Sequence, residues 1–167
     1  MPDYHFRKAV EADRPAITRI VDAAFRPEDV VTFLNALRED DCIIGEWVAE
    51  TGGGIVAHIV FSRVFVETPD GGRTKAAMLT PLAVHPDRQN RGIGTALMDH
   101  AIRALEAAGE DLFVVLGHPD YYPRAGFSAE AAGDLKNPWQ GNPAFMARGA
   151  VPSGGTLIMP PSIANAH

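Results

Sequence analysis

The sequence lacks most of the features that mark secreted, membrane and nucleic-acid-binding proteins. Its 167 residues include one cysteine, Cys42, so no internal disulfide can form and a reducing, cytoplasmic location is expected. No apolar run approaches the ~20 residues that a membrane-spanning helix needs. Residues 1–8 have no apolar core of the kind found in a secretory signal. A net charge of −6 opposes non-specific binding to nucleic acid and mildly favours a cationic substrate. We therefore expect neither a membrane nor a nucleic acid as a partner.

The composition indicates one folded domain. Hydrophobic residues make up 46% of the chain and charged residues 22%, which is enough apolar material for a sizeable core. No repeat, linker or low-complexity segment divides residues 1–167, so a single domain is predicted. Cys42 is expected to be a small buried apolar residue rather than a nucleophile. The six histidines form no closely spaced pair, and with one cysteine they predict no metal site.

The hydrophobic pattern predicts antiparallel strands first and a strand–loop–helix unit afterwards. Strands are expected at 4–8, 43–50, 55–66 and 76–84, with glycine-rich turns at 51–54 and 69–72. Helices are expected at 13–25, capped by Asp13, and at 29–38. The apolar run 112–116 follows a crossover helix, which favours a buried strand parallel to the one ending at Val84. A short helix at 121–127, ended at Gly126, and late strands at 145–148 and 155–159 complete the prediction.

The stretch from residue 82 to residue 108 is the most informative part of the chain. An apolar strand end is followed by a basic loop, by Gly92-Ile93-Gly94, and by apolar residues at helical spacing (Leu97, Ala101 and Leu105). A glycine-bearing turn that leads into a helix gathers unpaired backbone N–H groups at the positive end of the helix dipole. This arrangement predicts a site for phosphate.

Two motifs in order carry a resemblance to a known family. Leu82-Ala83-Val84, followed by Gln89-Asn90-Arg91-Gly92-Ile93-Gly94, resembles the Q/R-x-x-G-x-G/A acetyl-CoA signature of the GCN5-related N-acetyltransferases (GNAT). Tyr122-Pro-Arg-Ala-Gly126-Phe127 resembles the second landmark of that family, Tyr-x-x-x-Gly-Phe. Residues 116–127 look like those of the YhbS-like branch of predicted acetyltransferases. The resemblance covers roughly residues 4–130. It implies an α/β (α+β) fold in which helices flank a central mixed, mostly antiparallel twisted sheet, with a V-shaped splay between strands four and five.

The resemblance also implies how acetyl-CoA is bound as co-substrate. Backbone groups of the strand Leu82, Ala83 and Val84 would pair with the pantetheine arm where the strands splay, as an edge strand pairs with an added peptide. Pro81, which has no N–H, is consistent with a β-bulge just before that point. Backbone amides would cradle the pyrophosphate along the loop and first turn, from Gln89, Asn90, Arg91, Gly92, Ile93, Gly94 and Thr95. A Cβ at Gly92 or Gly94 would block that close approach. Arg88 and Arg91 add local positive charge, and Tyr121 packs or touches the cofactor.

The chemistry implied by the family is direct acyl transfer from the thioester to a primary amine. Tyr122 aligns with the tyrosine that family members use as general acid toward the leaving thiolate. A lysine-like amine has a pKa of ~10.4, so a base must accept its proton at neutral pH. His118, four residues before Tyr122, is the first candidate for that base, and Glu46 and His58 are weaker candidates.

Several alternatives remain open at the level of sequence. A catalytically silent acyl-CoA-binding or regulatory domain on the same fold is the main rival, because a fold does not fix a function. A nucleotide-binding enzyme is disfavoured, since neither G-x-x-x-x-G-K-[ST] nor a G-x-G-x-x-G after a first strand occurs. The acceptor is a small-molecule amine, a peptide N-terminus or a protein lysine, and residues 25–41 and 129–153 are expected to select it. The resemblance also allows a homodimer, which no sequence feature decides.

Overall fold

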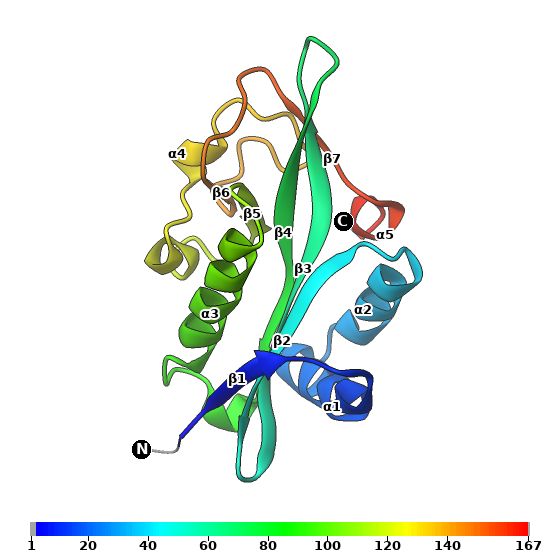
Figure 1. Cartoon of the computed structure of the whole chain (residues 1–167), viewed down its shortest axis with the longest axis vertical. Helices are drawn as coiled ribbons and strands as arrows, with labels where there is room; N and C mark the ends of the chain where they lie inside the picture. Colours follow the sequence, from blue (N-terminus) through cyan, green and yellow to red (C-terminus); the bar gives the residue numbers. More distant parts are fainter. Residues whose placement is uncertain (1–2, 167) are drawn as a thin grey trace.

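The computed structural model describes residues 3–166, which form one twisted sheet with helices on both faces (Figure 1). The strands are β1 (His5–Lys8), β2 (Ile43–Thr51), β3 (Gly54–Glu67), β4 (Arg73–Val84), β5 (Phe113–Leu116), β6 (Phe145–Arg148) and β7 (Thr156–Ile158). The α-helices are α1 (Arg14–Phe25), α2 (Val30–Glu39), α3 (Ile93–Ala107), α4 (Ala129–Ala132) and α5 (Pro161–Ala164). Short 3-10 turns lie at Glu11–Asp13, Pro86–Arg88 and Tyr122–Ala125.

The sheet is mixed and mostly antiparallel, as predicted. Its strands follow the order β1-β2-β3-β4-β5-β6, and the pair β4–β5 is parallel. The remaining strand, β7, pairs with residues Phe65–Glu67 of β3. This part of β3 lies beyond Ser62, the last β3 residue that pairs with β2. One edge of the long strand β3 is therefore shared by β2 and β7. The sequence predicted β7 but gave no indication of its partner.

The predicted splay between the fourth and fifth strands is present. β4 and β5 are paired at only two positions, Ala77 with Phe113 and Met78 with Val114. Beyond Met78, β4 continues for six residues without β5 beside it. The pairing of β3 with β4 shifts register between Ile59 and Phe61, opposite Thr80 and Pro81, which confirms the predicted bulge. The bulge and the gap thus lie at the same level of β4.

The two faces of the sheet carry two separate apolar cores. On one face, side chains of α1 and α2, among them Ile17 and Leu34, pack against Val60 and Val64 of β3. On the other face, Leu97 and Met98 of α3 pack against Phe61. Figure 1 shows α1 and α2 on one side of the sheet and α3 on the other. None of the helices in residues 3–166 is long and apolar enough to cross a membrane.

Most predicted elements are confirmed, and one capping prediction is wrong. Asp13 precedes α1 but its side chain makes no capping hydrogen bond to that helix. It accepts instead from the backbone N–H of Val10 and from the guanidinium of Arg7, at 2.8 Å each. Asp29, in contrast, does cap α2, because its Oδ1 accepts from Thr32 N at 3.0 Å. Cys42 is buried, as expected.

Candidate functional site

A cleft of about 720 Å³ opens where β4 ends, beside the N-terminus of α3. Its second wall is formed by the segment after β5, and the end of α1 contributes Ala24 and Phe25. The cleft therefore occupies the gap that the splayed strands leave at this end of the sheet. Most of the residues predicted to form the site line it: Leu82, Val84, Gln89, Asn90, Gly92, Ile93, Gly94, Thr95, His118, Tyr121 and Tyr122.

Two of the predicted binding residues, Ala83 and Arg91, do not line this cleft. Backbone hydrogen-bonding groups point to alternate sides along a strand. His85 N donates to Val56 O of β3 at 2.8 Å, so Ala83, two residues earlier, also turns its backbone groups toward β3. The backbone groups of Leu82 and Val84 consequently face the gap, as predicted for those two residues. The side chain of Arg91 is exposed to solvent outside the cleft.

The loop before α3 is anchored to the end of β4. Gln89 Nε2 donates to Val84 O at 3.0 Å, and the imidazole of His85 accepts from Asp87 N at 3.1 Å. Asn90 adopts a left-handed conformation, with φ = 64°. These contacts place the first amides of α3 at the cleft, where they have no partner within the helix.

The two glycines of the motif have structural roles beside the predicted close approach of a phosphate, which stays a prediction. A Cβ added to Gly92 would meet no atom within 4 Å; its backbone, however, is left-handed with φ = +81°, which favours glycine. A Cβ on Gly94 would lie 2.7 Å from the Tyr121 hydroxyl and 3.2 Å from Val84 Cγ2. Gly92 therefore sets the turn into α3, and Gly94 makes room for Tyr121.

Tyr121 links the two walls of the cleft. Its hydroxyl accepts a hydrogen bond from Thr95 Oγ1 at 3.2 Å, in the first turn of α3. The guanidinium of Arg124 lies 5.6 Å from the centre of its ring, which is within cation–π range. The expected packing role of Tyr121 is therefore present in the structure.

Tyr122 lies beneath Tyr121, and only 8% of its surface is exposed. Its ring meets those of Tyr121 and Phe127 edge to face, with centroid distances of 5.1 and 6.0 Å. A Cβ on Gly117 would lie 2.2 Å from Tyr122 Cε2, so Gly117 makes space for this ring. Burial, assisted by the adjacent Tyr121, raises the pKa of the Tyr122 phenol well above its usual value. The phenol thus remains protonated, and able to donate, throughout the physiological pH range.

The cleft is electropositive although the chain is acidic. Arg88 and Arg124 line it together with His118, whereas none of its lining residues is Asp or Glu. An anion in this cleft would meet two guanidinium groups and a helix N-terminus. His118 is exposed, and its backbone carbonyl accepts from Tyr121 N and Tyr122 N at 3.1 and 3.4 Å. His118 and Tyr122 therefore share one turn.

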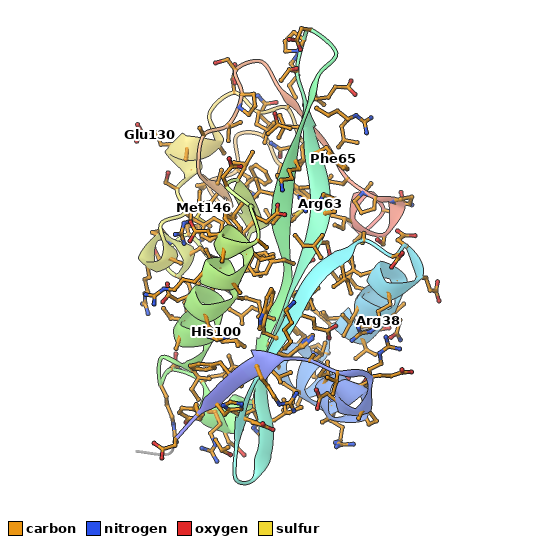
Figure 2. The ribbon with its side chains drawn as sticks, in the orientation of Figure 1. Arg38, Arg63, Phe65, His100, Glu130 and Met146 are labelled. Carbon is orange, nitrogen blue, oxygen red and sulfur yellow. The ribbon has the colours of Figure 1, made fainter. Side chains whose placement is uncertain are left out.

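The weaker candidates for the base, Glu46 and His58, do not line the cleft. Arg38 binds both oxygens of Glu46 at 2.8 Å, and His58 Nε2 lies 2.6 Å from Glu46 Oε2. Burial alone would raise the pKa of Glu46, but the hydrogen bonds from His58 and Arg38 outweigh it and hold that pKa at about 2. His58 is fully buried. In Figure 2, Arg38 lies at α2, on the side of the sheet opposite α3.

Sequence reasoning missed Gly117, Arg124 and Ala24, whereas Phe25 begins the range 25–41 that was expected to select the acceptor. Arg124 lies inside the Tyr-Pro-Arg-Ala-Gly-Phe motif, and its place in that motif could have indicated that it lies near the site. Nothing local in the sequence indicates that Ala24 reaches the cleft, because that contact depends on how α1 packs on the sheet.

Comparison with known proteins identifies the family. The family model described as "Acetyltransferase (GNAT) domain" matches residues 5–129, which is most of the chain and includes both motifs. The chain belongs to the GNAT acetyltransferase family. Within the family it falls in the YhbS-like branch.

Three relatives of this GNAT protein illustrate the likeness. The uncharacterized N-acetyltransferase YhbS of Escherichia coli K12 is 27% identical over 136 residues, which cover 81% of this chain and 80% of YhbS. The crystal structure of a GNAT family acetyltransferase from Brucella melitensis in complex with acetyl-CoA has a TM-score of 0.79 and is 28% identical, covering 98% of this chain and 99% of that one. The structure of E. coli YhbS in complex with CoA has a TM-score of 0.86 at 24% identity, covers 100% of this chain and 95% of that one, and shows the shared fold.

Proposed function

We propose that this GNAT domain transfers the acetyl group of acetyl-CoA to a primary amine by direct attack. The observation that carries the proposal is the cleft at the splay. It combines backbone groups of β4, the amides at the start of α3 and two arginines with a buried tyrosine and a histidine. The acetyl-CoA and CoA seen bound in the two structural relatives add to this.

In the proposed complex, each part of acetyl-CoA has a complementary group in the cleft. The pantetheine arm pairs with the gap-facing backbone of Leu82 and Val84. The pyrophosphate accepts hydrogen bonds from the amides of residues 92–95, while Arg88 and Arg124 balance its charge. Among residues 3–166, none of those that line this cleft has a carboxylate that would repel a phosphate.

The proposed reaction proceeds in one displacement. The amine nitrogen attacks the thioester carbonyl, a C–N bond forms, the C–S bond breaks, and CoA leaves as a thiolate. Tyr122 donates its phenolic proton to that sulfur and regains one from solvent. The phenol is protonated at neutral pH, as donation requires, although burial raises its pKa and makes it a weaker acid toward the thiolate.

His118 is proposed as the base. Deprotonating an amine with a pKa of ~10.4 at neutral pH costs roughly 4–5 kcal/mol, so a nearby proton acceptor is needed. His118 lines the same cleft as Tyr122 and is exposed, so a proton taken there passes readily to water. Glu46 is a poor alternative, because it is already bound to Arg38 and His58.

The test is acetyl-CoA turnover across primary amines, with release of the free CoA thiol as the readout. Tyr122→Phe is expected to lower kcat by about 100-fold, a usual contribution of a general acid, while the Kd for acetyl-CoA stays within about twofold. His118→Ala is expected to shift the pH profile of kcat toward higher pH, because more amine must then lose its proton without help. Tight binding of acetyl-CoA without thiol release for any amine class would instead identify a silent acyl-CoA-binding domain.

A further inference from the structure

A second cavity, of about 240 Å³, lies outside the residues used above. It is formed by α4, by the loop that follows it, and by the start of β6. Its apolar wall includes Leu135 and the stacked rings of Trp139 and Phe145, whose centroids are 5.8 Å apart at an interplanar angle of 20°. None of the described residues that line it carries a charge. We call this cavity the aromatic pocket.

The aromatic pocket is preformed by local hydrogen bonds. Asn137 donates to Leu135 O and accepts from Trp139 N, both at 2.8 Å. Asn142 Oδ1 accepts from Ala144 N at 2.9 Å. These two amides hold the loop in shape, and the exposed Gln140 adds a further amide to the lining. Little ordering of the loop is therefore needed before a ligand enters.

One backbone hydrogen bond joins the segment that lines the aromatic pocket to the segment that lines the acetyl-CoA cleft. Gly117 N donates to Ala144 O at 2.9 Å. Ala144 lies between Pro143 and Phe145, which line the aromatic pocket, and Gly117 directly precedes His118, which lines the cleft. The loop of the aromatic pocket is therefore tied, at the carboxyl end of β5, to the segment that carries the two proposed catalytic residues.

An exposed apolar side chain lies beside this hydrogen bond. Leu116 is 38% exposed and is one of two exposed large hydrophobic residues within residues 3–166. It is the cross-strand partner of Phe145, so the two side chains share one face of the sheet. The next residue, Met146, belongs to the core on the α3 face and lies beside α3 in Figure 2. Leu116 thus lies on the opposite face, next to the buried ring of Phe145 that lines the aromatic pocket.

We propose that the aromatic pocket binds the body of the acceptor, an uncharged group with a single aromatic ring on a short chain that ends in the reacting amine. A cavity of about 150 Å³ accepts benzene, so this pocket has room for one ring and a few more atoms. A second cationic group, as in a polyamine, would lose its hydration here without gaining a carboxylate partner. The inference rests on the proposed function and adds the class of acceptor to it.

The experiment compares kcat/KM for 2-phenylethylamine, propylamine and spermidine, with acetyl-CoA as donor and free thiol as readout. Burial of the ring is expected to favour 2-phenylethylamine over propylamine by about 30-fold. Ala129→Phe places a large side chain at the aromatic pocket from an exposed position of α4 and is expected to abolish that preference while kcat/KM for propylamine stays within about twofold. Ala107→Phe, at an exposed position of α3 away from both cavities, is the matched control and is expected to keep the preference.

Calorimetry with 2-phenylethylamine alone separates the two proposals. If kcat/KM is equal for the three amines, or if the preference for 2-phenylethylamine survives Ala129→Phe, the proposal that the aromatic pocket binds the acceptor is wrong. The proposal of acetyl transfer is then unaffected. Binding of 2-phenylethylamine that Ala129→Phe abolishes, without thiol release from any amine, supports the aromatic pocket as an amine site and overturns the proposed function. If 2-phenylethylamine does not bind and no amine causes thiol release, both proposals are overturned.

Discussion

Replacing Gly117 with alanine should disturb Tyr122 without touching either substrate. The added Cβ would lie 2.2 Å from Cε2 of the Tyr122 ring and 2.8 Å from Cδ2. Carbon atoms at ordinary contact are about 3.5 Å apart or more, so the ring has to move by about 1 Å. Tyr121 and Phe127 hold the ring from two sides, edge to face, so that movement has no easy direction.

The expected magnitudes follow from this clash. Overpacking of a buried side chain costs about 1–3 kcal/mol of the free energy of unfolding, measured by urea denaturation. A displacement of about 1 Å at a reacting group lowers the rate by about 100-fold, so kcat for thiol release should fall by that factor. Gly52→Ala is the matched control, because a Cβ there meets nothing within 4 Å, and both quantities should stay at their wild-type values.

A double-mutant comparison decides whether the effect passes through the Tyr122 hydroxyl. In a Tyr122→Phe background the hydroxyl is already gone, so Gly117→Ala should lower kcat only a few-fold further. An unchanged kcat in the single variant Gly117→Ala would refute the catalytic role of Tyr122. An equally large loss in the Tyr122→Phe background would show that Gly117 acts through another group.

Three further predictions concern charge. Gly92→Asp should weaken acetyl-CoA binding at least about 10-fold more than Gly92→Asn in calorimetry, because both side chains meet the same left-handed backbone but only aspartate repels a phosphate. Arg124→Gln should raise the Kd for acetyl-CoA about 10-fold and reduce its salt dependence, whereas Arg103→Gln, at an exposed position of α3, should change neither. The pKa of Glu46 is about 2 in the folded chain, below its usual value, so its stabilisation is complete above about pH 5 and declines as the pH falls toward 2. Between about pH 6 and pH 3 the wild type should lose roughly 2 kcal/mol of unfolding free energy that Glu46→Gln does not lose, and equal losses in the two proteins would contradict this account.

Much of the fold is predicted by local sequence pattern. The alternation of apolar residues, the glycine-rich turns and the proline at position 81 specify strands, hairpins and the bulge, because each depends on neighbours in the chain. The run from Leu82 to Thr95 specifies a strand end, a loop and a helix start in the same way. The predicted capping role of Asp13 was wrong because the guanidinium of Arg7, in β1, binds its carboxylate instead.

The shape of the site was decided by contacts between distant segments. Gly92 could be assigned to a turn from sequence, but the need for glycine at 94 comes from Tyr121, which lies 27 residues further along the chain. The placement of β7 on β3 and the hydrogen bond between Gly117 and Ala144 likewise depend on pairings that no local pattern encodes. The sequence by itself thus determined the strand end, loop and helix start that we propose hold a phosphate-bearing donor, because these form one continuous stretch. Only the tertiary structure decided which side chains surround the reacting atoms, because those side chains come from separate elements brought together by packing.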